Sequence, residues 1–316
     1  MYQHLQLIQR AKELGISVND VSQIMDQPFT VLTFNGLSEL VRDGVPTSWI
    51  NVRSQFYCDN KQLTKLAYEE LGIPYPKSVM FKVPDEPTLE RFFKKGQKYV
   101  CKPLDGTNGV GVMMGIQNLK GVQSYFEGNR QLGTLFIMEE QVSGQDLRIQ
   151  VLGGEIVAAC IRVPAFVIGN GKDNLETLIE NRRRLMKTQN PNNFLEIDES
   201  TLSLIKQQGL GLIDKPKKNK KIQLKHVSNM AQGAIATDVT DDIHPIYEDW
   251  VSKLVDYLKA PYFGVDIITP DFTKDPYENA WVLEINARAD WLHHTFSERK
   301  THDMAGMILK TIFGNG

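Results

Sequence analysis

The sequence predicts a mixed fold of helices and strands, α/β or α+β, because signals for the two element types alternate along most of the chain. Of the 316 residues, 41% are hydrophobic and 23% are charged, a balance that can bury a substantial core in two or three lobes. Between two apolar runs, the pair Gly153-Gly154 tolerates positive φ at both positions and predicts a β-hairpin over residues 147–163. We therefore expect a folded chain, with this hairpin as its most strongly specified element.

The first 53 residues predict a small N-terminal cap, with a helical start, an apolar strand at residues 31–34 and another around residues 49–52. Helix signals sharpen from Asp59 onward. Asp59 and Gln62 have the spacing of a capping box, and apolar residues three and four positions apart form one face of the helix that follows. A glycine and a proline at positions 72 and 74 end this helix.

Strands and helices then follow one another to the end of the chain. In chain order, the pattern predicts a strand at 79–82, a helix at 88–95, strands at 99–104, 111–114 and 135–140, the hairpin at 147–163, helices at 175–186, 201–208 and 245–258, strands at 262–268 and 280–286, and a last helix at 303–312. A lysine-rich segment at 215–221 interrupts this series and is expected to be a solvated loop.

Charge and cysteine content exclude several classes of protein. Lysine and arginine total 36 against 38 aspartate and glutamate, so no global field suits nucleic acid or an anionic membrane. The 3 cysteines are far apart and odd in number, which argues against a disulfide framework and favours a reducing cytoplasm. The N-terminus lacks a secretory signal pattern, and no apolar run is long enough to span a bilayer. We expect a cytoplasmic protein without nucleic-acid or membrane partners.

A glycine-rich turn follows the predicted strand at 99–104. Residues 100–112 read Val-Cys-Lys-Pro-Leu-Asp-Gly-Thr-Asn-Gly-Val-Gly-Val, which places Lys102 at the strand end. Its ammonium group can hold phosphate oxygens by charge, and three glycines let backbone N–H groups approach a triphosphate: Gly106, Gly109 and Gly111. No GK[ST] closes the turn, so it is not a Walker loop. A tight β-turn with a surface lysine is the alternative interpretation.

Polar side chains end the last two predicted strands, Asp266 in one and Glu284 and Asn286 in the other. Because residues two apart share one face of a strand, Glu284 and Asn286 point the same way, and a neighbouring strand would bring Asp266 beside them. Carboxylate and amide oxygens suit Mg²⁺, which completes its shell with water and nucleotide phosphates. Strand-end acids that face water are the alternative, but apolar neighbours make these side chains polar exceptions in their strands.

A third segment, residues 136–146, has the sequence Phe-Ile-Met-Glu-Glu-Gln-Val-Ser-Gly-Gln-Asp. A buried strand that runs into a short extended linker leaves backbone N–H and C=O groups able to pair with an adenine edge. An acid a few residues later can accept hydrogen bonds from ribose hydroxyls. Alone, this pattern is a weak signal for a nucleotide.

In this order and at these distances, the three segments resemble the ATP-grasp superfamily, and within it the ATP-grasp module of cyanophycin synthetases and bifunctional glutathione synthetases. The resemblance spans about residues 54–313 and depends on the co-occurrence of several short stretches. These stretches are Asp59-Asn60-Lys61 with Thr64-Lys65, Lys102 to Gly106, Asp146-Leu147-Arg148, Ala158 to Arg162 with Pro164-Ala165, Ile168 to Gly171, Gln208-Gly209-Leu210, Asp238 to Asp241 with His244-Pro245, and Glu284-Ile285-Asn286.

The resemblance implies an α+β ATP-grasp fold in which two α+β lobes clasp ATP. We expect a short N-terminal cap over residues 1–53 and a lobe with the glycine-rich lid over residues 54–137. A second lobe, over residues 138–316, would hold the adenine linker, the metal site and the acceptor pocket. The implied cofactors are ATP and one or two Mg²⁺ ions, with Mn²⁺ as a substitute.

The resemblance also implies roles for individual residues. ATP would be bound by Lys61, Lys102, Gly106, Gly109, Gly111, Glu139, Glu140, Val142 and Asp146. Of these, Asp146 would hold the ribose. Mg²⁺ would be held by Asp266, Glu284 and Asn286, and the catalytic set is Arg162, Lys102 and Arg288. The fixed charge of Arg162 would stabilise the γ-phosphate or an acyl phosphate during transfer.

Two departures from the family pattern concern the substrate. Relatives often carry a Ser-Thr-Gly-Gly-like turn before the Asp-Val-Thr-Asp stretch, where this chain has Ala231-Gln232-Gly233-Ala234. They also carry a Pro-Gly segment and Arg-Met-His after the Glu-x-Asn stretch, where this chain has Arg288-Ala289-Asp290-Trp291-Leu292-His293-His294. The phosphate-binding stretches are therefore kept, while the stretches that line the acceptor pocket are altered.

The candidate substrate contacts are Arg148, Lys225, Asn229, Gly233 and His294, and the candidates for carboxylate recognition are Arg288, His294 and Arg299. The pair His293-His294 does not predict a metal site, because neighbouring residues on an extended chain point apart. Cys101 and Cys160 lie within apolar strands, where a buried thiol is expected and a nucleophile is not.

The resemblance implies an ATP-dependent carboxylate–amine ligase that joins amino acids or short peptides through an acyl phosphate and releases ADP and phosphate. Other specificities of the superfamily, such as a dipeptide or peptide-tailoring ligase, stay open. A non-catalytic ATP-binding module and phosphoryl transfer to a non-acyl acceptor are the further alternatives. The sequence does not exclude a homodimer.

Overall fold

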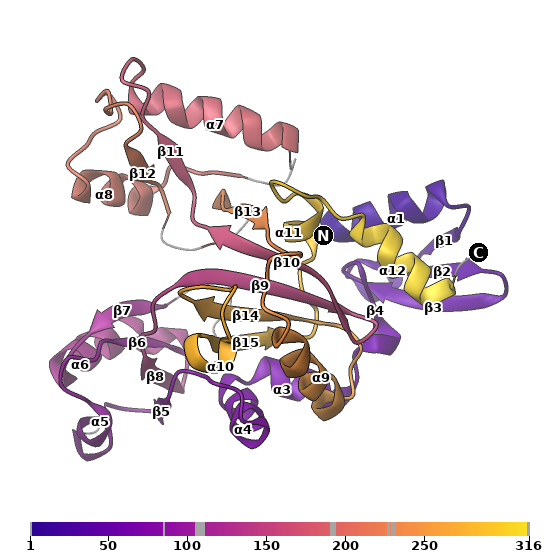
Figure 1. Cartoon of the computed structure of the whole chain (residues 1–316), viewed down its shortest axis with the longest axis horizontal. Helices are drawn as coiled ribbons and strands as arrows, with labels where there is room; N and C mark the ends of the chain where they lie inside the picture. The colour runs from indigo at the N-terminus through magenta and orange to yellow at the C-terminus, as the bar shows by residue number, and fades with distance from the viewer. Residues whose placement is uncertain are drawn as a thin grey trace. The chain divides into compact units, whose positions relative to one another are not determined.

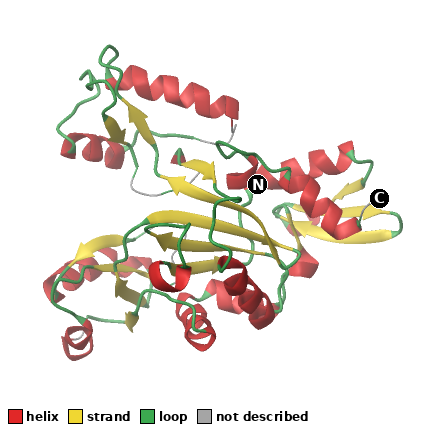
Figure 2. Ribbon diagram, in the orientation of Figure 1, coloured by secondary structure: helices red, strands yellow, loops and turns green. Residues whose placement is uncertain are grey.

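The computed structural model describes residues 2–84, 86–104, 111–189, 194–225, 228 and 232–314 (Figure 1). Helices and strands are mixed along the chain (Figure 2), and the predicted α+β class is confirmed. The chain forms two compact units. The first unit holds Met1–Ser48, Val157–Asp241 and Asp290–Gly316, and the second holds Trp49–Ile156 and Asp242–Ala289. The domain boundaries expected after residues 53 and 137 stay a prediction.

Three antiparallel strands of the second unit carry the polar strand ends. They are β9 (Gln145–Leu152), β14 (Phe263–Thr269) and β15 (Trp281–Asn286), with β14 in the middle. The short helix α10 (Pro276–Asn279) lies between β14 and β15 in the sequence. Helices α3 (Val52–Asp59), α4 (Lys61–Leu71) and α9 (Tyr247–Leu258) pack on one another, and α3 and α4 also contact β15. These contacts bring the ends of α3 and β15 together.

A second antiparallel sheet of this unit has the strand order β5-β8-β6-β7. Its strands are β5 (Ser78–Phe81), β6 (Tyr99–Pro103), β7 (Met113–Ile116) and β8 (Phe136–Glu140). Helices α5 (Glu86–Phe92) and α6 (Leu119–Asn129), the latter followed by the 3-10 turn η2 (Arg130–Leu132), cover one face. Cys101 and Met138 belong to the core on that face, so Lys102 and Glu139, one position further along, point to the other.

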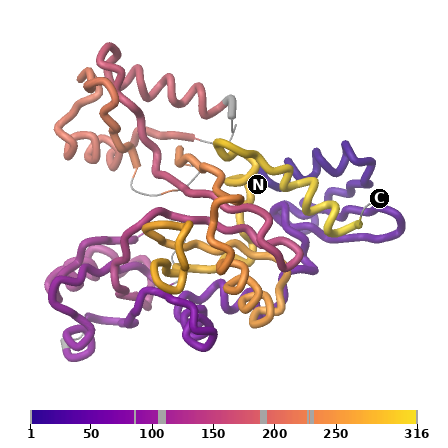
Figure 3. The backbone as a smooth tube through the Cα atoms, viewed as in Figure 1, coloured from indigo at the N-terminus to yellow at the C-terminus, as the bar shows by residue number. Residues whose placement is uncertain are grey.

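The N-terminal part of the first unit is a four-stranded antiparallel sheet. It consists of β1 (Ser17–Asp20), β2 (Phe29–Phe34), β3 (Leu37–Arg42) and β4 (Val45–Pro46), with α2 (Ser22–Met25) between β1 and β2. Helix α1 (Tyr2–Glu13) packs on α12 (Met304–Phe313), so the first and last helices lie side by side (Figure 3). The Nε1 of Trp291 donates a hydrogen bond to the Gly44 carbonyl at 3.1 Å, which ties the C-terminal segment to this sheet.

The rest of the first unit contains two further strand pairs. Strand β10 (Glu155–Val163) pairs antiparallel with β13 (Ile235–Asp238), and β11 (Phe166–Ile168) pairs antiparallel with β12 (Lys221–Gln223). Helices α7 (Leu175–Gln189) and α8 (Glu199–Gln207) bury Ile179 and Ile205 in a core that also contains Val167 and Ile222. A short helix, α11 (Leu292–Thr295), precedes α12. No helix in the described part of the chain has the length and apolar content needed to cross a bilayer.

Two turn predictions are confirmed where glycines adopt positive φ. Gly153 and Gly154 separate β9 from β10 with φ values of 66° and 88°, as the predicted turn requires. Gly72 ends α4 with a φ of 68°, in the left-handed region that relieves the last carbonyls of a helix.

Two other local predictions are wrong. The strand expected around residues 49–52 is replaced by the 3-10 helix η1 (Thr47–Trp49) and the start of α3, where the Asn51 side chain accepts a hydrogen bond from the Ser54 amide. The expected N-cap of α4 is off by one residue, because Asn60 and not Asp59 accepts the capping hydrogen bonds, from the amides of Gln62 and Leu63. Both side chains are good N-caps, so the sequence alone does not choose between them.

Candidate functional site

Two adjacent antiparallel strands bring three oxygen-bearing side chains together. Asp266 on β14 pairs in register with Glu284 on β15. The Nδ2 of Asn286 lies 3.4 Å from the Oδ2 of Asp266. The ladder shifts at a bulge after Asp266, and bulges of this kind re-aim side chains beside functional sites. The expectation that these three residues lie together is confirmed, whereas their role as metal ligands stays a prediction.

The carboxylates of this group are only partly balanced by positive charge. Arg148 on β9 is in register with Asp266, and its Nη1 lies 2.5 Å from the Oδ1 of Asp266. Burial, and then the Asp266 carboxylate, raise the pKa of Glu284, while Lys61 and Lys102 act in the opposite direction. We call Arg148, Asp266, Glu284 and Asn286 the acidic cluster. Its hard oxygen atoms and its excess of negative charge fit a Mg²⁺ ion.

Two lysines share one buried carboxylate on the face of the β5-β8-β6-β7 sheet that lies opposite its core. The Nζ of Lys102 lies 2.5 Å from one oxygen of Glu139, and the Nζ of Lys65 lies 2.7 Å from the other. Burial raises the pKa of Glu139, but the two ammonium groups outweigh it and bring the value to about 2. We call Lys65, Lys102 and Glu139 the lysine cluster. Its excess of positive charge fits a phosphate group.

Lys65 is a site residue for which the sequence suggested no role. It is only 2% exposed, and besides Glu139 its Nζ contacts the Pro76 carbonyl at 3.3 Å. Lys61 lies four positions earlier on the same face of α4, and its Nζ donates to the Leu104 carbonyl at 3.2 Å. The buried residues of α4 are Thr64, Lys65, Ala67 and Tyr68, whereas Leu66 is 54% exposed. The helix therefore buries a different face from the one that its leucines predict, and the leucine pattern gave no signal for Lys65.

The predicted glycine-rich lid is described only in part, because Gly106 and Gly109 lie outside the described residues. Gly111 has a φ of 70°, and a Cβ at this position would come within 2.7 Å of Leu132 and 3.0 Å of Pro103. The Tyr125 hydroxyl donates to the Gly111 carbonyl at 2.9 Å. The backbone therefore requires glycine at position 111, and its contact with ATP stays a prediction.

The residues expected at the adenine and the ribose lie where β8 passes into β9. Val142 is in the irregular segment between these strands, and Asp146 lies on β9 in register with Ile268. The Oε1 of Glu140 is 2.6 Å from the Nζ of Lys94, which is exposed. The carboxylate of Glu139 is held by the lysine cluster. Contacts of these residues with a nucleotide stay predictions.

Four residues predicted to act in catalysis or substrate binding belong to the first unit: Arg162, Lys225, Gly233 and His294. The Nζ of Lys225 lies 2.7 Å from Asp198, and this contact lowers the pKa of the Asp198 carboxyl. Gly233 has a φ of 94°, and a Cβ there would crowd Leu195 and Ala165. Asn229 lies outside the described residues. The roles proposed for these residues toward a substrate stay predictions.

The histidine pair adopts a conformation different from the expected one. His293 and His294 lie in the short helix α11, and both are buried, so the expectation of an extended segment is wrong. Trp291 precedes this helix and is fully buried, which draws the segment into the core of the first unit. Cys101 and Cys160 are buried in β6 and β10, as predicted.

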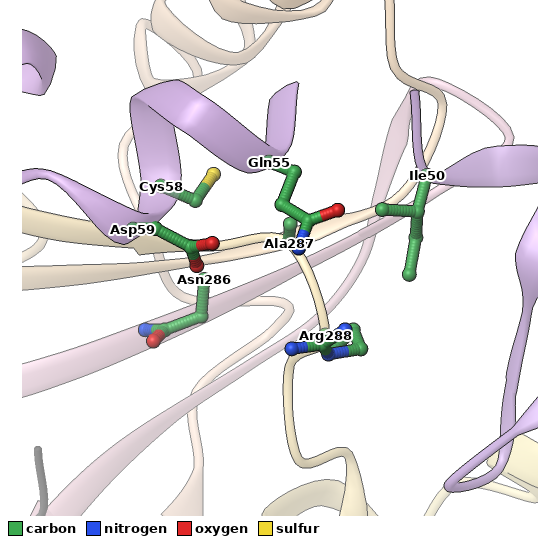
Figure 4. A pocket seen from close by; sticks show the side chains of 7 residues that line it. All are labelled: Ile50, Gln55, Cys58, Asp59, Asn286, Ala287 and Arg288. Atoms are coloured by element: carbon green, nitrogen blue, oxygen red, sulfur yellow. The ribbon is translucent and has the colours of Figure 1, made fainter. Parts of the chain in front are cut away.

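A pocket of about 180 Å³ lies beside Asn286, where the end of α3 meets the end of β15. Its lining consists of Ile50, Gln55, Cys58, Asp59, Asn286, Ala287 and Arg288 (Figure 4). Burial raises the pKa of the Cys58 thiol to about 12, so this thiol stays protonated at neutral pH. Arg288, a residue of the predicted catalytic set, is exposed in the pocket wall.

Comparisons with known sequences find relatives over most of the chain. A family model described as an ATP-grasp domain matches residues 58–290. Cyanophycin synthetase from Trichormus variabilis is 29% identical over 269 residues, which are 82% of this chain and 29% of that protein. The glutathione biosynthesis bifunctional protein GshAB from Mannheimia succiniciproducens is 28% identical over 307 residues, 90% of this chain and 40% of that protein. The chain thus spans less than half the length of these curated relatives.

Solved structures share the fold. A bifunctional glutathione synthetase from Pasteurella multocida superimposes with a TM-score of 0.72 at 23% identity, over 98% of this chain and 43% of that chain. The D-alanine–D-alanine ligase from Bacillus anthracis superimposes with a TM-score of 0.50 at 15% identity, over 83% of this chain and 69% of that chain. With the family model matching most of its length, this chain belongs to the ATP-grasp family.

Proposed function

We propose that this chain is an ATP- and Mg²⁺-dependent ligase that joins a carboxylate to an amine through an acyl phosphate, with amino acids or short peptides as substrates. One observation carries the proposal: the acidic cluster and the lysine cluster lie in the same compact unit, and Glu284 is within electrostatic range of Lys61 and Lys102. Two relatives named cyanophycin synthetase and GshAB, 29% and 28% identical, support this class of substrate.

The lysines would bind the triphosphate. Lys61 and Lys102 would hold phosphate oxygens by charge, and Glu139, anchored by the buried Lys65, would keep Lys102 in position. Asp266, Glu284 and Asn286 would hold the metal. When bound there, Mg²⁺ supplies positive charge to the phosphate oxygens, on which negative charge develops during transfer.

The remaining predicted contacts would orient the nucleotide and the reacting groups. Glu139, Glu140 and the backbone at Val142 would line the adenine, and Asp146 would accept hydrogen bonds from the ribose. Arg162 would stabilise the negative charge of the transferred phosphoryl group. The segment that ends at Gly111 would close over the phosphates and exclude water from the acyl phosphate.

The reaction would proceed in two displacements. A carboxylate oxygen of the first substrate attacks the γ-phosphorus, and the bond from that phosphorus to ADP breaks. The amine nitrogen of the second substrate then attacks the acyl carbon, phosphate leaves, and the nitrogen loses a proton. No covalent bond to the protein is needed, in keeping with the burial of Cys101 and Cys160 and the partial burial of Cys58. We place the reaction in the cytoplasm, because the odd number and wide spacing of the cysteines do not suit a disulfide framework.

ADP release tests this proposal. The chain is incubated with ATP, Mg²⁺ and pairs of amino acids or dipeptides, and the product is identified by mass spectrometry. When hydroxylamine replaces the amine, it traps the acyl phosphate as a hydroxamate. ATP binding without ADP release across the whole panel would contradict the proposal and favour a non-catalytic module. ADP release without any hydroxamate would instead indicate phosphoryl transfer to a non-acyl acceptor.

A further inference from the structure

We propose that the pocket beside Asn286 binds the amine substrate as a free α-amino acid, with the amino group at Asp59 and the α-carboxylate at Arg288. This inference depends on the ligase function proposed above and names the class of its second substrate. It gives a role to Asp59 and Gln55, two residues of α3 to which the sequence assigned no part in substrate binding.

Two charges of opposite sign line this pocket without an ion-pair partner in the part of the chain that the structure describes: Asp59 and Arg288. Asp59 is the last residue of α3, and Arg288 lies two residues beyond the end of β15. Both side chains are exposed, whereas the buried charges Lys65, Glu139 and Asp266 of the same unit are paired. A ligand that carries one charge of each sign would complement the two unpaired side chains, and an α-amino acid has this charge pattern at neutral pH.

The local structure leaves the Asp59 carboxylate available for a ligand. Asn60 provides the N-cap of α4, so Asp59 is not used to satisfy the first amides of that helix. In Figure 4 the carboxylate of Asp59 is directed toward Asn286 and the amide of Gln55 toward Ala287, so both polar groups of α3 face the end of β15. Gln55 lies one turn before Asp59 on the same helix, and its amide can both donate and accept hydrogen bonds.

The pocket contains no third charge among its lining residues. Cys58 forms a hydrogen bond with the backbone of Ala287, which ties α3 to the segment that carries Arg288. The remaining lining residues, Ile50, Ala287 and the amides of Gln55 and Asn286, are neutral. The pocket therefore offers one anionic end and one cationic end joined by a neutral wall.

Size and position favour a single amino acid at the reacting end of the site. The volume of about 180 Å³ is below the roughly 300–1,000 Å³ typical of pockets for drug-sized ligands, so it suits a smaller molecule. Asn286 belongs both to this pocket and to the acidic cluster. Asp59 lies two residues before Lys61, which we expect at the phosphates. An amino group at Asp59 would therefore lie beside the place where the acyl phosphate forms.

The first arm of the test separates amine binding from acyl phosphate formation. Amide formation is measured with each of the twenty standard L-amino acids as the amine, and hydroxamate formation is measured with hydroxylamine, which is small and needs neither charged end of the pocket. We expect Asp59→Asn to lower kcat/KM for the amino acid about ten- to hundred-fold, the range for a lost charge-assisted hydrogen bond, and to leave the hydroxamate rate unchanged. The matched control is Asp256→Asn, a carboxylate on α9 whose side chain is 81% exposed.

The second arm tests the carboxylate end with the α-amides of the same amino acids. The unmodified chain should prefer each accepted amino acid over its α-amide by about ten-fold or more, because the amide cannot pair with the guanidinium of Arg288. Arg288→Gln should bring the two rates to within a factor of about two. The matched control is Arg91→Gln, an exposed arginine at the end of α5 that should keep the full preference.

The outcomes distinguish this inference from the function on which it depends. Loss of the acid-over-amide preference in Arg288→Gln, with hydroxamate formation kept in Asp59→Asn, supports the assignment. An unchanged preference in Arg288→Gln, or an equal loss of amide and hydroxamate in Asp59→Asn, overturns it while the ligase function stands. If the unmodified chain forms neither amide nor hydroxamate, the ligase function fails and the assignment fails with it.

Discussion

The two buried charge clusters of the second unit differ in the sign of the charge that they leave unbalanced. In the lysine cluster, Lys65 and Lys102 share the one carboxylate of Glu139, which leaves an excess of positive charge. In the acidic cluster, Asp266 is paired with Arg148 while Glu284 lies beside it, which leaves an excess of negative charge. The first fits an anion and the second a cation. MgATP contains both an anionic triphosphate and a metal cation, so this one ligand would satisfy both clusters.

Unbalanced charge inside a protein costs free energy, and a ligand that balances it stabilises the folded state. Each cluster should therefore respond to its own ligand. Substitutions that alter the excess charge of one cluster should change binding and stability in a direction that the sign of that charge sets.

The largest effect is expected at Glu284. Replacing Glu284 by Gln removes one of the two carboxylates of the acidic cluster, and ADP formation should fall by at least about a hundred-fold, since even residues that only support a metal ligand cost ten- to hundred-fold when changed. Stabilisation of the fold by Mg²⁺ with a non-hydrolysable ATP analogue should also be lost in thermal unfolding. Glu278→Gln, an exposed carboxylate on α10, should retain both responses. A Glu284→Gln chain that kept its Mg²⁺-dependent stabilisation would argue against a metal at this cluster.

The next effect concerns the fold. Glu139→Gln leaves the ammonium of the 2%-exposed Lys65 without its carboxylate, and the free energy of unfolding should fall by about 3–5 kcal/mol in urea titrations. Lys65→Met combined with Glu139→Gln should be less destabilised than Glu139→Gln alone, because no buried charge is left unpaired between these two positions. Glu140→Gln, whose partner Lys94 is exposed, should leave the midpoint nearly unchanged. Equal stability of Glu139→Gln and the unmodified chain would show that the pair is not buried in solution.

The pH dependence of the free energy of unfolding should also show the titration of the Glu139 carboxyl. Its pKa is lowered from 4.5 to about 2 in the folded chain, so its contribution is fully present above about pH 4.5 and is lost as the pH falls toward 2. The shift corresponds to about 3 kcal/mol across this window. Urea titrations between pH 5 and 2 should show this loss in the unmodified chain and a shallower one in Glu139→Gln. Parallel profiles for the two chains would contradict the assignment.

A smaller effect is expected from Lys65→Met on nucleotide binding. The substitution removes one positive charge from the lysine cluster and leaves Lys102 to neutralise Glu139 without help from Lys65. Less positive charge then remains for the phosphates, so the Kd for a non-hydrolysable ATP analogue should rise about ten-fold. Lys65→Arg keeps the charge and should recover part of the affinity. If Lys65→Met bound the analogue as tightly as the unmodified chain, the role of Lys65 would be limited to stability.

The grouping of Asp266, Glu284 and Asn286 could be predicted from sequence patterns. Asp266 and Glu284 lie in apolar strands near the end of the chain, and the alternation of side chains fixes which residues share a face. Only one assumption was needed beyond this, that the two strands are neighbours. The hairpin turn at Gly153-Gly154 was equally accessible, because positive φ at both positions restricts the choice of residue.

The lysine cluster could not be predicted in the same way. Lys65 and Glu139 lie on a helix and a strand far apart in the sequence, and only tertiary packing brings them together. The N-cap of α4 was predicted wrongly for a different reason. Asp59 and Asn60 are both good N-caps, and the helix begins after Asn60. The pair His293-His294 lies in a short helix at whose start the Asp290 carboxylate accepts a hydrogen bond from the Leu292 amide, a local interaction that the extended interpretation did not consider.

The most direct test of the complementary clusters is the binding of a non-hydrolysable ATP analogue, measured by titration calorimetry at several Mg²⁺ concentrations. The unmodified chain should bind the analogue more tightly as Mg²⁺ increases. Lys102→Met should weaken binding at every Mg²⁺ concentration, and Glu284→Gln should remove the dependence on Mg²⁺ and leave metal-free binding intact. Identical Mg²⁺ dependence in all three chains would contradict the assignment of a phosphate to one cluster and a metal to the other.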